Sequence, residues 1–310
     1  MATLLGAFTA AVLPIVTVAF VGYLLGRGTD IDAGPLSTVS VYVLLPALVF
    51  HSLATTAMPG GTVVRFLLAD GLYVAAMLAV AFALARAAGG DGTTLALGGT
   101  FSNAGNYGIP LVTFALGAVG RDAAVLYVVG QVPLMYTVGG FLAARGRGVS
   151  AAGAVRDVFR LPLVYAVVAA ALARWLGVVP DPGTSAMRTV QLVGEAAIPV
   201  MLLALGVELA QTTAGTTLRA VLPAVGLKLL VAPVVAVGAA LALGLSGVVA
   251  DAFVLQSATP IALTPLFLVL TFEGQGEASG YLSTAVLLST VGSVLTLPVV
   301  IWALSAGALG

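Results

Sequence analysis

The stretch SNAGNYGIPL, from Ser102 to Leu111, interrupts an apolar run that extends from about residue 93 to about residue 118. It is not an ordinary loop between two spanning helices. The eight or nine residues on either side rise only about 13 Å, whereas the hydrocarbon core of a bilayer is about 30 Å thick. A proline kink in a continuous helix is tolerated in membranes, but it does not explain two asparagines and several small residues beside Pro110. The stretch therefore predicts a discontinuous helix whose unwound middle lines a cavity or is buried in protein.

The composition indicates an integral membrane protein. Of the 310 residues, 60% are hydrophobic and 8% are charged, whereas a soluble domain carries about 25% charged residues. The formal net charge of zero gives no indication of a nucleic-acid partner. The sequence has no cysteine and a single histidine, His51, which excludes disulfides, thiol catalysis and multi-histidine metal centres, so no cofactor is expected. The N-terminus lacks a basic segment and is too long for the apolar part of a signal peptide, and we interpret it as a retained span.

Ten apolar segments can cross a membrane as helices, at roughly 20 residues per span. They are residues 3–26, 35–56, 63–86, 93–118, 122–144, 159–178, 188–210, 218–245, 249–272 and 279–306. The longest connection, RGRGVSAAGAVRDVFR (145–160), is rich in arginine and divides the chain into five spans and five. The predicted fold class is an all-α integral membrane protein of ten transmembrane helices, in two five-helix repeats at 1–144 and 159–310 with a cytoplasmic connector at 145–158.

The arginines determine the predicted orientation. By the positive-inside rule the side richer in arginine is cytoplasmic, which places both termini outside a multi-pass protein of the cell (plasma) membrane. The side that follows spans 1, 3, 5, 7 and 9 holds Arg27, Arg86, Arg145, Arg147, Arg156, Arg160 and Arg219, and the opposite side holds Arg65, Arg121, Arg174 and Arg188.

The two halves share a proline pattern. Pro46 and Pro110 are 64 residues apart in the first half, and Pro199 and Pro265 are 66 residues apart in the second. Each pair falls in the second and fourth spans of its half. Because each half has an odd number of spans, two similar halves must have opposite topologies, and an inverted repeat is favoured.

The ninth span contains a second interruption, in LQSATPIALTPLF (255–267). Pro260 and Pro265 each remove a backbone donor and clash with the carbonyl four residues earlier, and the neighbouring hydroxyl and amide side chains can satisfy the freed groups. Two unwound segments, one in each half, are what a transport site of crossing helices requires. The N-termini of the half-helices carry about half a positive charge, which favours an anion such as a carboxylate, with Asn103 and Asn106 as uncharged donors.

Asp70, Glu195 and Lys228, which is the single lysine of the chain, each lie well inside a predicted span and away from its ends. Each costs about 2.5–3.5 kcal/mol at the centre of a membrane and less near its edge. All three are candidates for a proton or support site. Because spans 3 and 8 are counterparts in the two halves, Asp70 and Lys228 can face one another, either as a structural ion pair or as a proton relay. For Glu195, a carboxylate that reaches the interface or is simply paired is the plainer interpretation.

At these residues the sequence resembles the auxin efflux carrier family, which includes the plant PIN-type carriers and many prokaryotic proteins. The resemblance covers most of the chain. Plant members differ in two respects, since many have a long cytoplasmic loop and a basic–acidic pair where this chain has Leu270-Thr271-Phe272. The motifs that carry the resemblance are Asn103 followed by Gly108-Ile109-Pro110-Leu111, then Gln256, Pro260 and Pro265 with YLSTAVLLSTVGSVLTLPVV (281–300), and LLPALVFHSLA (44–54).

The resemblance implies a carrier whose spans 4 and 9 cross near the midplane, where the substrate binds. It implies a scaffold of spans 1, 2, 6 and 7, a mobile transport domain of spans 3–5 and 8–10, and a homodimer. It points to Asn103 as a ligand of the substrate carboxylate, to Pro110 with Pro260 or Pro265 at the crossover, and to Asp70 in a polar support site. The family is associated with auxin in plants and with dicarboxylates such as malate in bacteria.

The favoured function is a secondary active or potential-driven transporter that exports a small organic anion by alternating access, with protons and the lipid bilayer as further partners. A sodium- or proton-coupled symporter of the bile acid carrier type is the nearer alternative, and a non-transporting sensor or channel is the other. An enzyme is disfavoured, because His51 is the only histidine, no HExxH motif occurs and Asp70 has no aspartate partner within the membrane. The predicted substrate-binding residues are Ser102, Asn103, Asn106, Tyr107, Gln256, Ser257 and Thr259, and the predicted crossover residues are Gly108, Pro110, Pro260 and Pro265.

Overall fold

The computed structural model describes residues 3–144, 156 and 158–307, and these residues form helices with one isolated bridge between extended segments. Among them, seven helical stretches are long and apolar enough to cross a membrane, and two shorter apolar helices accompany them. The predicted all-α membrane class is confirmed. Most of the predicted connector at 145–158 lies outside the described residues.

The helices follow the predicted segments closely. Up to residue 144 they are α1 (Leu4–Ala7), α2 (Leu13–Gly28), α3 (Ala33–Val39), α4 (Leu45–Thr55), α5 (Gly60–Ala88), α6 (Gly92–Thr100), α7 (Ile109–Leu134) and α8 (Gly140–Ala143). In the second half they are α10 (Pro162–Leu176), α11 (Ser185–Glu195), α12 (Ala197–Gln211), α13 (Leu218–Gly226), α14 (Ala232–Ala242), α15 (Gly247–Ser257), α16 (Thr264–Phe272) and α17 (Glu277–Ser305).

Five π-helical turns connect some of these helices in the described residues. Four of them end two residues before a proline, so that the carbonyl four residues before each proline lies inside the wider turn. The proline ring would clash with that carbonyl in a regular α-helix, and a π turn moves it away. The turns are η1 (Phe8–Val12, before Pro14), η2 (Ser40–Leu44, before Pro46), η3 (Ala104–Gly108, before Pro110), η4 (Met135–Gly139) and η5 (Leu227–Val231, before Pro233).

Helix α7 is two helices joined at a glycine. Gly117 has φ 68° and ψ −155°, a backbone conformation that breaks the helix and that residues with a Cβ rarely adopt. The break lies at the predicted boundary between the fourth span (93–118) and the fifth (122–144). We therefore treat the part of α7 before Gly117 as the end of the fourth span.

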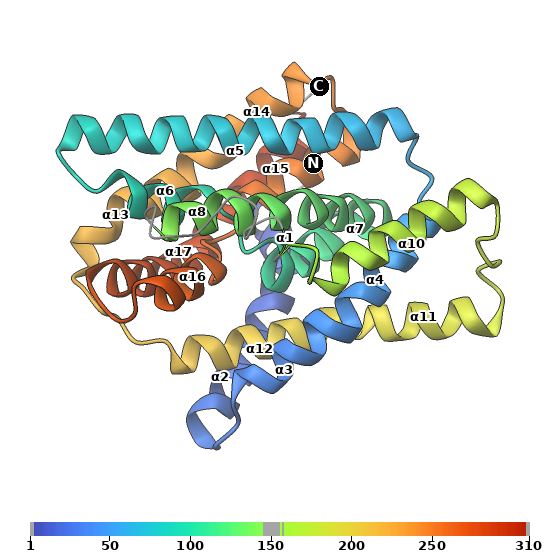
Figure 1. The fold of residues 1–310 in the computed structure, drawn as a ribbon, viewed down its shortest axis with the longest axis horizontal. Coiled ribbons are helices and arrows are strands. Elements are labelled where there is room, and N and C mark those ends of the chain that lie inside the picture. Colours follow the sequence, from blue (N-terminus) through green and yellow to red (C-terminus); the bar gives the residue numbers. More distant parts are fainter. Residues whose placement is uncertain (1–2, 145–155, 157, 308–310) are drawn as a thin grey trace.

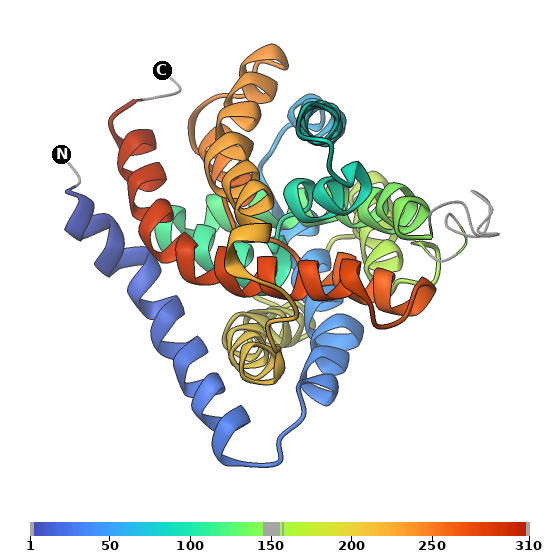
Figure 2. The ribbon, with the colours of Figure 1, turned by 90° about the vertical axis from the view of Figure 1, so that its left-hand side faces the viewer.

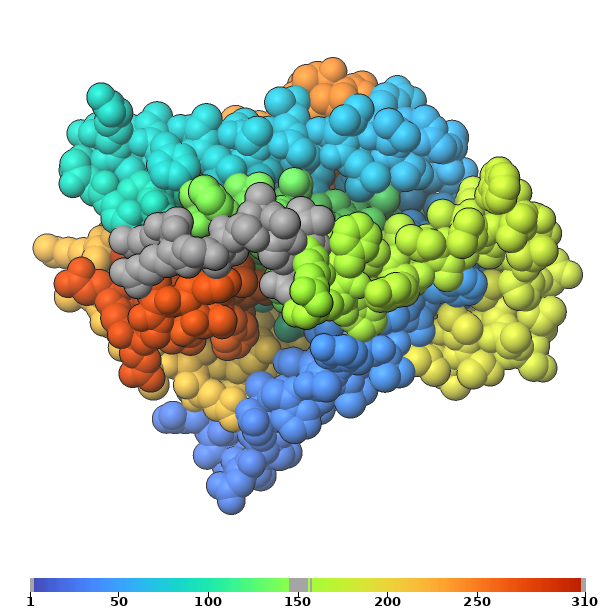
Figure 3. All heavy atoms as spheres, in the orientation of Figure 1, coloured from blue at the N-terminus to red at the C-terminus, as the bar shows by residue number. Residues whose placement is uncertain are grey.

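The helices pack as two groups. One group contains α2, α3, α4, α10, α11 and α12, and the other contains α5 to α8 with α13 to α17. In Figure 1 the first group occupies the lower part, and α5 runs along the upper edge. Figure 2 shows α5 and the α11–α12 segment nearly end-on, which means that they run in similar directions. The space-filling view in Figure 3 shows α5 as a ridge above α10, with α3 and α4 below.

The first group is held by a close approach of α2 and α12. A Cβ added to Gly22 would collide with the backbone of Leu203, and one added to Gly206 would collide with the backbone of Ala19. Small residues allow this approach, and close packing replaces the hydrophobic effect as the cause of helix association inside a bilayer.

Candidate functional site

The two predicted interruptions lie against one another. The N–H of Asn103 donates to the carbonyl of Pro260 at 2.8 Å, and the N–H of Ala262 donates to the carbonyl of Phe101 at 3.1 Å. These bonds make an antiparallel bridge between Ser102 and Ile261. Unwound backbone at membrane depth has no water to bond to, so each interruption supplies the partners that the other has lost. The chain leaves the helix at residues 101–103, between the end of α6 and the start of η3, which overlaps the beginning of the predicted interruption.

Two side chains complete the hydrogen bonding of the unwound backbone. The Oε1 of Gln131 accepts from the N–H of Ser102 at 2.9 Å, and its Nε2 donates to the carbonyl of the same residue at 2.8 Å. In the interruption of the ninth span, the N–H of Ile261 donates to the Oγ of Ser289 at 3.1 Å. Gln131 thus bonds to Ser102 as a neighbouring β-strand would. Sequence reasoning left it out of the site because a single glutamine in a span has no distinctive pattern.

Pro110 and Pro265 lie near the beginnings of the helices that follow the two interruptions. The hydrogen bonds between the interruptions involve neither of these prolines. Both occupy one of the first two positions of their helices, α7 and α16. Pro265 fits there because the first N–H groups of a helix need no acceptor inside it, whereas Pro110 follows η3 without a break and is accommodated by that wider turn. Pro260 supplies one of the two carbonyls that join the interruptions, and Phe101 supplies the other.

A buried lysine connects both interruptions to α5. The Nζ of Lys228 donates to the Oγ of Ser102 at 2.5 Å, to the carbonyl of Ser257 at 2.8 Å and to the hydroxyl of Tyr73 at 3.1 Å. An ammonium group has three donors, and these contacts use all of them. Lys228 is therefore fully bonded without a carboxylate.

Asp70 lies in the same interior but does not form the predicted ion pair. Its side chain is buried, both carboxyl oxygens lack a hydrogen-bond partner, and no ion pair to Lys228 occurs among the described residues. The carboxyl group packs against Gly130, where an added Cβ would collide with it. Asp70 and Lys228 thus share the same interior without a direct ion pair among the described residues, and their role as a support or proton site stays a prediction.

Glu195 is separate from both. It is half-exposed, lies 3.6 Å from the guanidinium of Arg121 and accepts a hydrogen bond from Gln191 at 2.8 Å. The structure thus does not bring Glu195 to Asp70 or Lys228, and the plainer interpretation as a paired carboxylate describes its position. We leave it out of the site below.

A cavity of about 260 Å³, here called the crossover cavity, opens where the two helix groups meet. Ligand sites for drug-sized molecules occupy about 300–1,000 Å³, so this cavity suits a small ligand. The interruption in the fourth span and the start of α16 form one wall, and α3, α10 and α12 form the other. Its polar lining residues are Ser37, Ser102, Asn103, Asn106, Gln131, Tyr136, Glu208 and Thr264.

The wall at the interruptions is suited to an anion. The first N–H groups of η3 and of α16 have no acceptor within their helices, and both helix starts border the cavity. Asn103 is 7% exposed, and its side chain makes no capping bond to the helix that follows. Asn103 and Asn106 are the only asparagines in the sequence, and both line this cavity.

The opposite wall carries a carboxylate that sequence reasoning missed. The Oε1 of Glu208, on α12, accepts from the hydroxyl of Ser37 at 2.9 Å, and its Oε2 is buried without a hydrogen-bond partner among the described residues. No lysine or arginine is among the residues that line the cavity. The sequence does show an acidic residue one turn from the end of an apolar span. Nothing in the sequence, however, places that residue opposite Asn106.

Four predicted substrate residues do not reach the cavity. Gln256 donates to the carbonyl of Ala124 at 3.2 Å, and the hydroxyls of Ser257 and Thr259 each donate at 2.7 Å to the carbonyl three residues earlier in the chain. They satisfy backbone groups near the interruption. Tyr107 lies in a different pocket, where its hydroxyl accepts from Ser293 at 3.2 Å. Gly108 gives Gln256 the space it needs, because a Cβ there would collide with the glutamine side chain.

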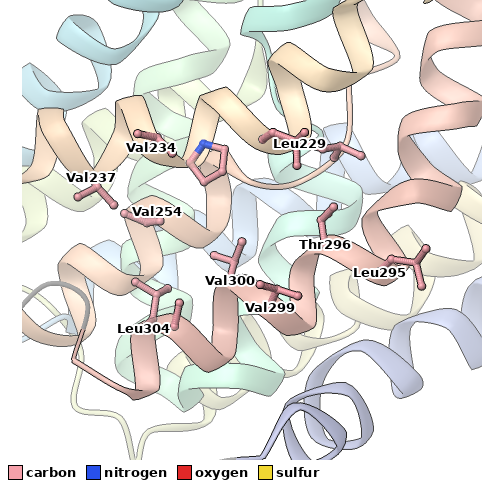
Figure 4. A pocket seen from close by; sticks show the side chains of 12 residues that line it. Leu229, Val234, Val237, Val254, Leu295, Thr296, Val299, Val300 and Leu304 are labelled. Carbon is pink, nitrogen blue, oxygen red and sulfur yellow. The ribbon is translucent and has the colours of Figure 1, made fainter. Parts of the chain in front are cut away.

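A second cavity, of about 390 Å³, lies between α14, α15 and α17 (Figure 4). The side chains around it are almost entirely apolar, with Thr296 the one polar residue labelled. Val234 and Leu295 are 69% and 77% exposed, as expected for residues that face lipid. This cavity has no group that would hold a small anion, so it is not our candidate site.

Comparison with known proteins identifies the family of the chain. The family described as "Membrane transport protein" matches residues 7–153 and again residues 150–301. The chain belongs to this family. The auxin efflux carrier resemblance is thus confirmed, the two matched stretches support a repeat, and the chain is a transporter and not an enzyme.

Two relatives extend over nearly the whole chain. A protein of Rhizobium meliloti (strain 1021) named "Putative malonate transporter" is 28% identical over 316 residues, which is 97% of each chain. A protein of Methanothermobacter thermautotrophicus named "Uncharacterized transporter" is 26% identical over 302 residues, covering 94% of this chain and 96% of its own.

Proposed function

We propose that this transporter carries a small organic anion, with a dicarboxylate of the size of malonate as the first candidate. The observation that carries the proposal is the crossover cavity, where two helix starts and the amide of Asn103 converge on a space too small for a large ligand. The name of the Rhizobium relative supports the same class of substrate. The binding residues in this proposal are Ser102, Asn103, Asn106 and the starts of η3 and α16.

We further propose ten spans in two inverted repeats, residues 1–144 and 159–310, with alternating access between the two helix groups. Spans 1, 2, 6 and 7 correspond to the first group and would be the scaffold. Spans 3–5 and 8–10 correspond to the second group and would move with the substrate. In support, the bonds of Lys228 connect Tyr73, Ser102 and Ser257 within the second group only. Export of the anion, termini outside the cell and a homodimer are part of the same proposal.

Solid-supported membrane recordings on proteoliposomes test the proposal directly. Malonate, malate and indole-3-acetate are applied to the wild type and to Asn103→Ala. We expect a saturable current for at least one anion, which the variant loses because the cavity loses its free amide. Gln275→Ala, which removes an exposed amide outside the cavity, is expected to keep the current. Folded wild-type protein that gives no current with any carboxylate would overturn anion transport.

A further inference from the structure

We propose that Glu208 is a built-in competitor of the transported anion, so that an anion enters the crossover cavity only when Glu208 carries a proton. The inference rests on the proposed anion transport and adds the coupling to it. It assigns the scaffold a chemical role, because Glu208 belongs to α12 and the anion-binding wall belongs to the interruptions of the other helix group.

The geometry places this carboxylate where a substrate carboxylate would bind. Glu208 and Asn106 line the same small cavity from opposite walls, and the amide of Asn106 lies beside the Glu208 carboxyl group. One carboxyl oxygen accepts from Ser37, and the other is buried without a partner among the described residues. A buried acceptor without a donor costs free energy, so this carboxyl oxygen is available to take up a proton.

Charge makes the two carboxylates mutually exclusive. An ionised Glu208 and a bound anion would share a cavity of about 260 Å³ whose lining contains no lysine or arginine. Two like charges inside so small a cavity repel strongly, because little bulk water is there to screen them. One of two carboxylates that share a site therefore takes up a proton. Proton uptake on Glu208 removes the repulsion and leaves the helix starts and amides free for the anion.

No other charged group among the described residues neutralises Glu208. Neither described ion pair includes it, and its side-chain neighbours are Ser37 and Asn106. Tyr136 also lines the cavity, from η4. The charged or titratable residues on the helices packed against α12 are Tyr23 and Arg27 on α2, Tyr42 on η2, Tyr107 on η3, Arg121, Asp122 and Tyr127 on α7, and Arg188 and Glu195 on α11, and α3 has none.

The test is malonate binding to the purified full-length protein in lipid nanodiscs, measured calorimetrically between about pH 5.5 and about pH 8.5. In the wild type the Kd is expected to increase by about tenfold per pH unit at the alkaline end, because one proton is linked to one anion. Glu208→Gln is expected to bind malonate with a nearly constant Kd over the same range, which also corrects for the titration of malonate itself. Glu277→Gln, an exposed acid outside the cavity, is expected to keep the wild-type slope.

Proton counting gives a second readout. Binding enthalpies in two buffers with different ionisation enthalpies are expected to show uptake of about one proton per anion in the wild type and none in Glu208→Gln. If Glu208→Gln misfolds, Ser37→Ala serves instead. It removes the donor that stabilises the carboxylate, so the pH above which malonate binding weakens is expected to move upward.

The outcomes separate this inference from the proposed function. A wild-type slope retained in Glu208→Gln, or loss of binding in that variant when it is folded, overturns the competitor role and leaves anion transport standing. Binding that depends on sodium and not on pH also overturns it, and indicates that Glu208 holds a cation. Absence of malonate binding by folded wild type and folded Glu208→Gln at every pH, together with a negative anion screen, overturns the proposed function itself.

Discussion

The Nζ of Lys228 lies 2.5 Å from the Oγ of Ser102, although the two residues are 126 positions apart in the chain. The contact joins η5 in the second half to the interruption in the first. Lys228 also binds the carbonyl of Ser257, which precedes the other interruption. One side chain therefore bonds to both broken helices at the point where they meet.

Lys228→Met is expected to destabilise the protein and to abolish the proposed anion transport. The variant leaves the buried Ser102 hydroxyl and Ser257 carbonyl without their donor, at about 1–3 kcal/mol for each unpaired group. Thermal unfolding in detergent and proteoliposome currents would measure the two effects. Arg27→Met, which removes an exposed cation at the end of α2, is the control and should change neither. An unchanged unfolding temperature for Lys228→Met would contradict this role.

Gln131→Leu tests the side chain that hydrogen-bonds to the unwound backbone of Ser102. Leucine is close to glutamine in size, but it leaves the N–H and the carbonyl of Ser102 unpaired at about 1–3 kcal/mol each. We expect a lower unfolding temperature and a loss of transport, because the interruption next to Asn103 loses its fixed conformation. The same substitution at Gln191, which is half-buried on α11 and bonds only to the side chain of Glu195 among the described hydrogen bonds, should have little effect. Equal stability of the two variants would show that the backbone finds other partners.

Gly206→Ala tests the packing of α2 on α12. The added methyl group would collide with the backbone of Ala19 and of Tyr23, so the helices must separate, and overpacking of this kind costs about 1–3 kcal/mol. Gly238→Ala, on α14, has open space around the added atom and is expected to be neutral or stabilising by up to about 1 kcal/mol. The unfolding temperatures of the two variants make the comparison, and a neutral Gly206→Ala would contradict the close approach.

Glu195→Gln is expected to leave the proposed anion transport unchanged, since this carboxylate is paired with Arg121 at the protein surface. Partly exposed ion pairs contribute less than about 1 kcal/mol, so stability should change little. Asp70→Asn, by contrast, is expected to lower transport, because Asp70 is buried beside the helices that carry the interruptions. Transport that depends on Glu195 and not on Asp70 would contradict both expectations.

The interruptions were predictable because their cause is local. Two asparagines and several small residues beside Pro110 cannot form a regular apolar span, and the length of the flanking pieces excludes a simple loop. The same reasoning applies to Pro260 and Pro265. The position of Ser102, Asn103 and Asn106 at one cavity followed from these local effects together with the expectation that the two breaks meet.

Other assignments failed because they depend on where a side chain points. Gln256, Ser257 and Thr259 are as polar as Asn103, but their groups bond to nearby carbonyls and do not line the crossover cavity. The periodicity of a broken helix does not specify which of its faces meets the cavity. Glu195 was considered and Glu208 was overlooked, although both are acids in the same predicted span.

The sequence by itself determined the membrane class and the places where the fourth and ninth spans break, because composition, chain length and the proline ring act within a few residues. The tertiary structure alone decided which partners satisfy the broken backbone and which charges meet. Gln131, Lys228 and Glu208 reach their partners across 29, 126 and 171 positions of the chain. Such contacts depend on the relative placement of whole helices, which results from the packing of many small residues together.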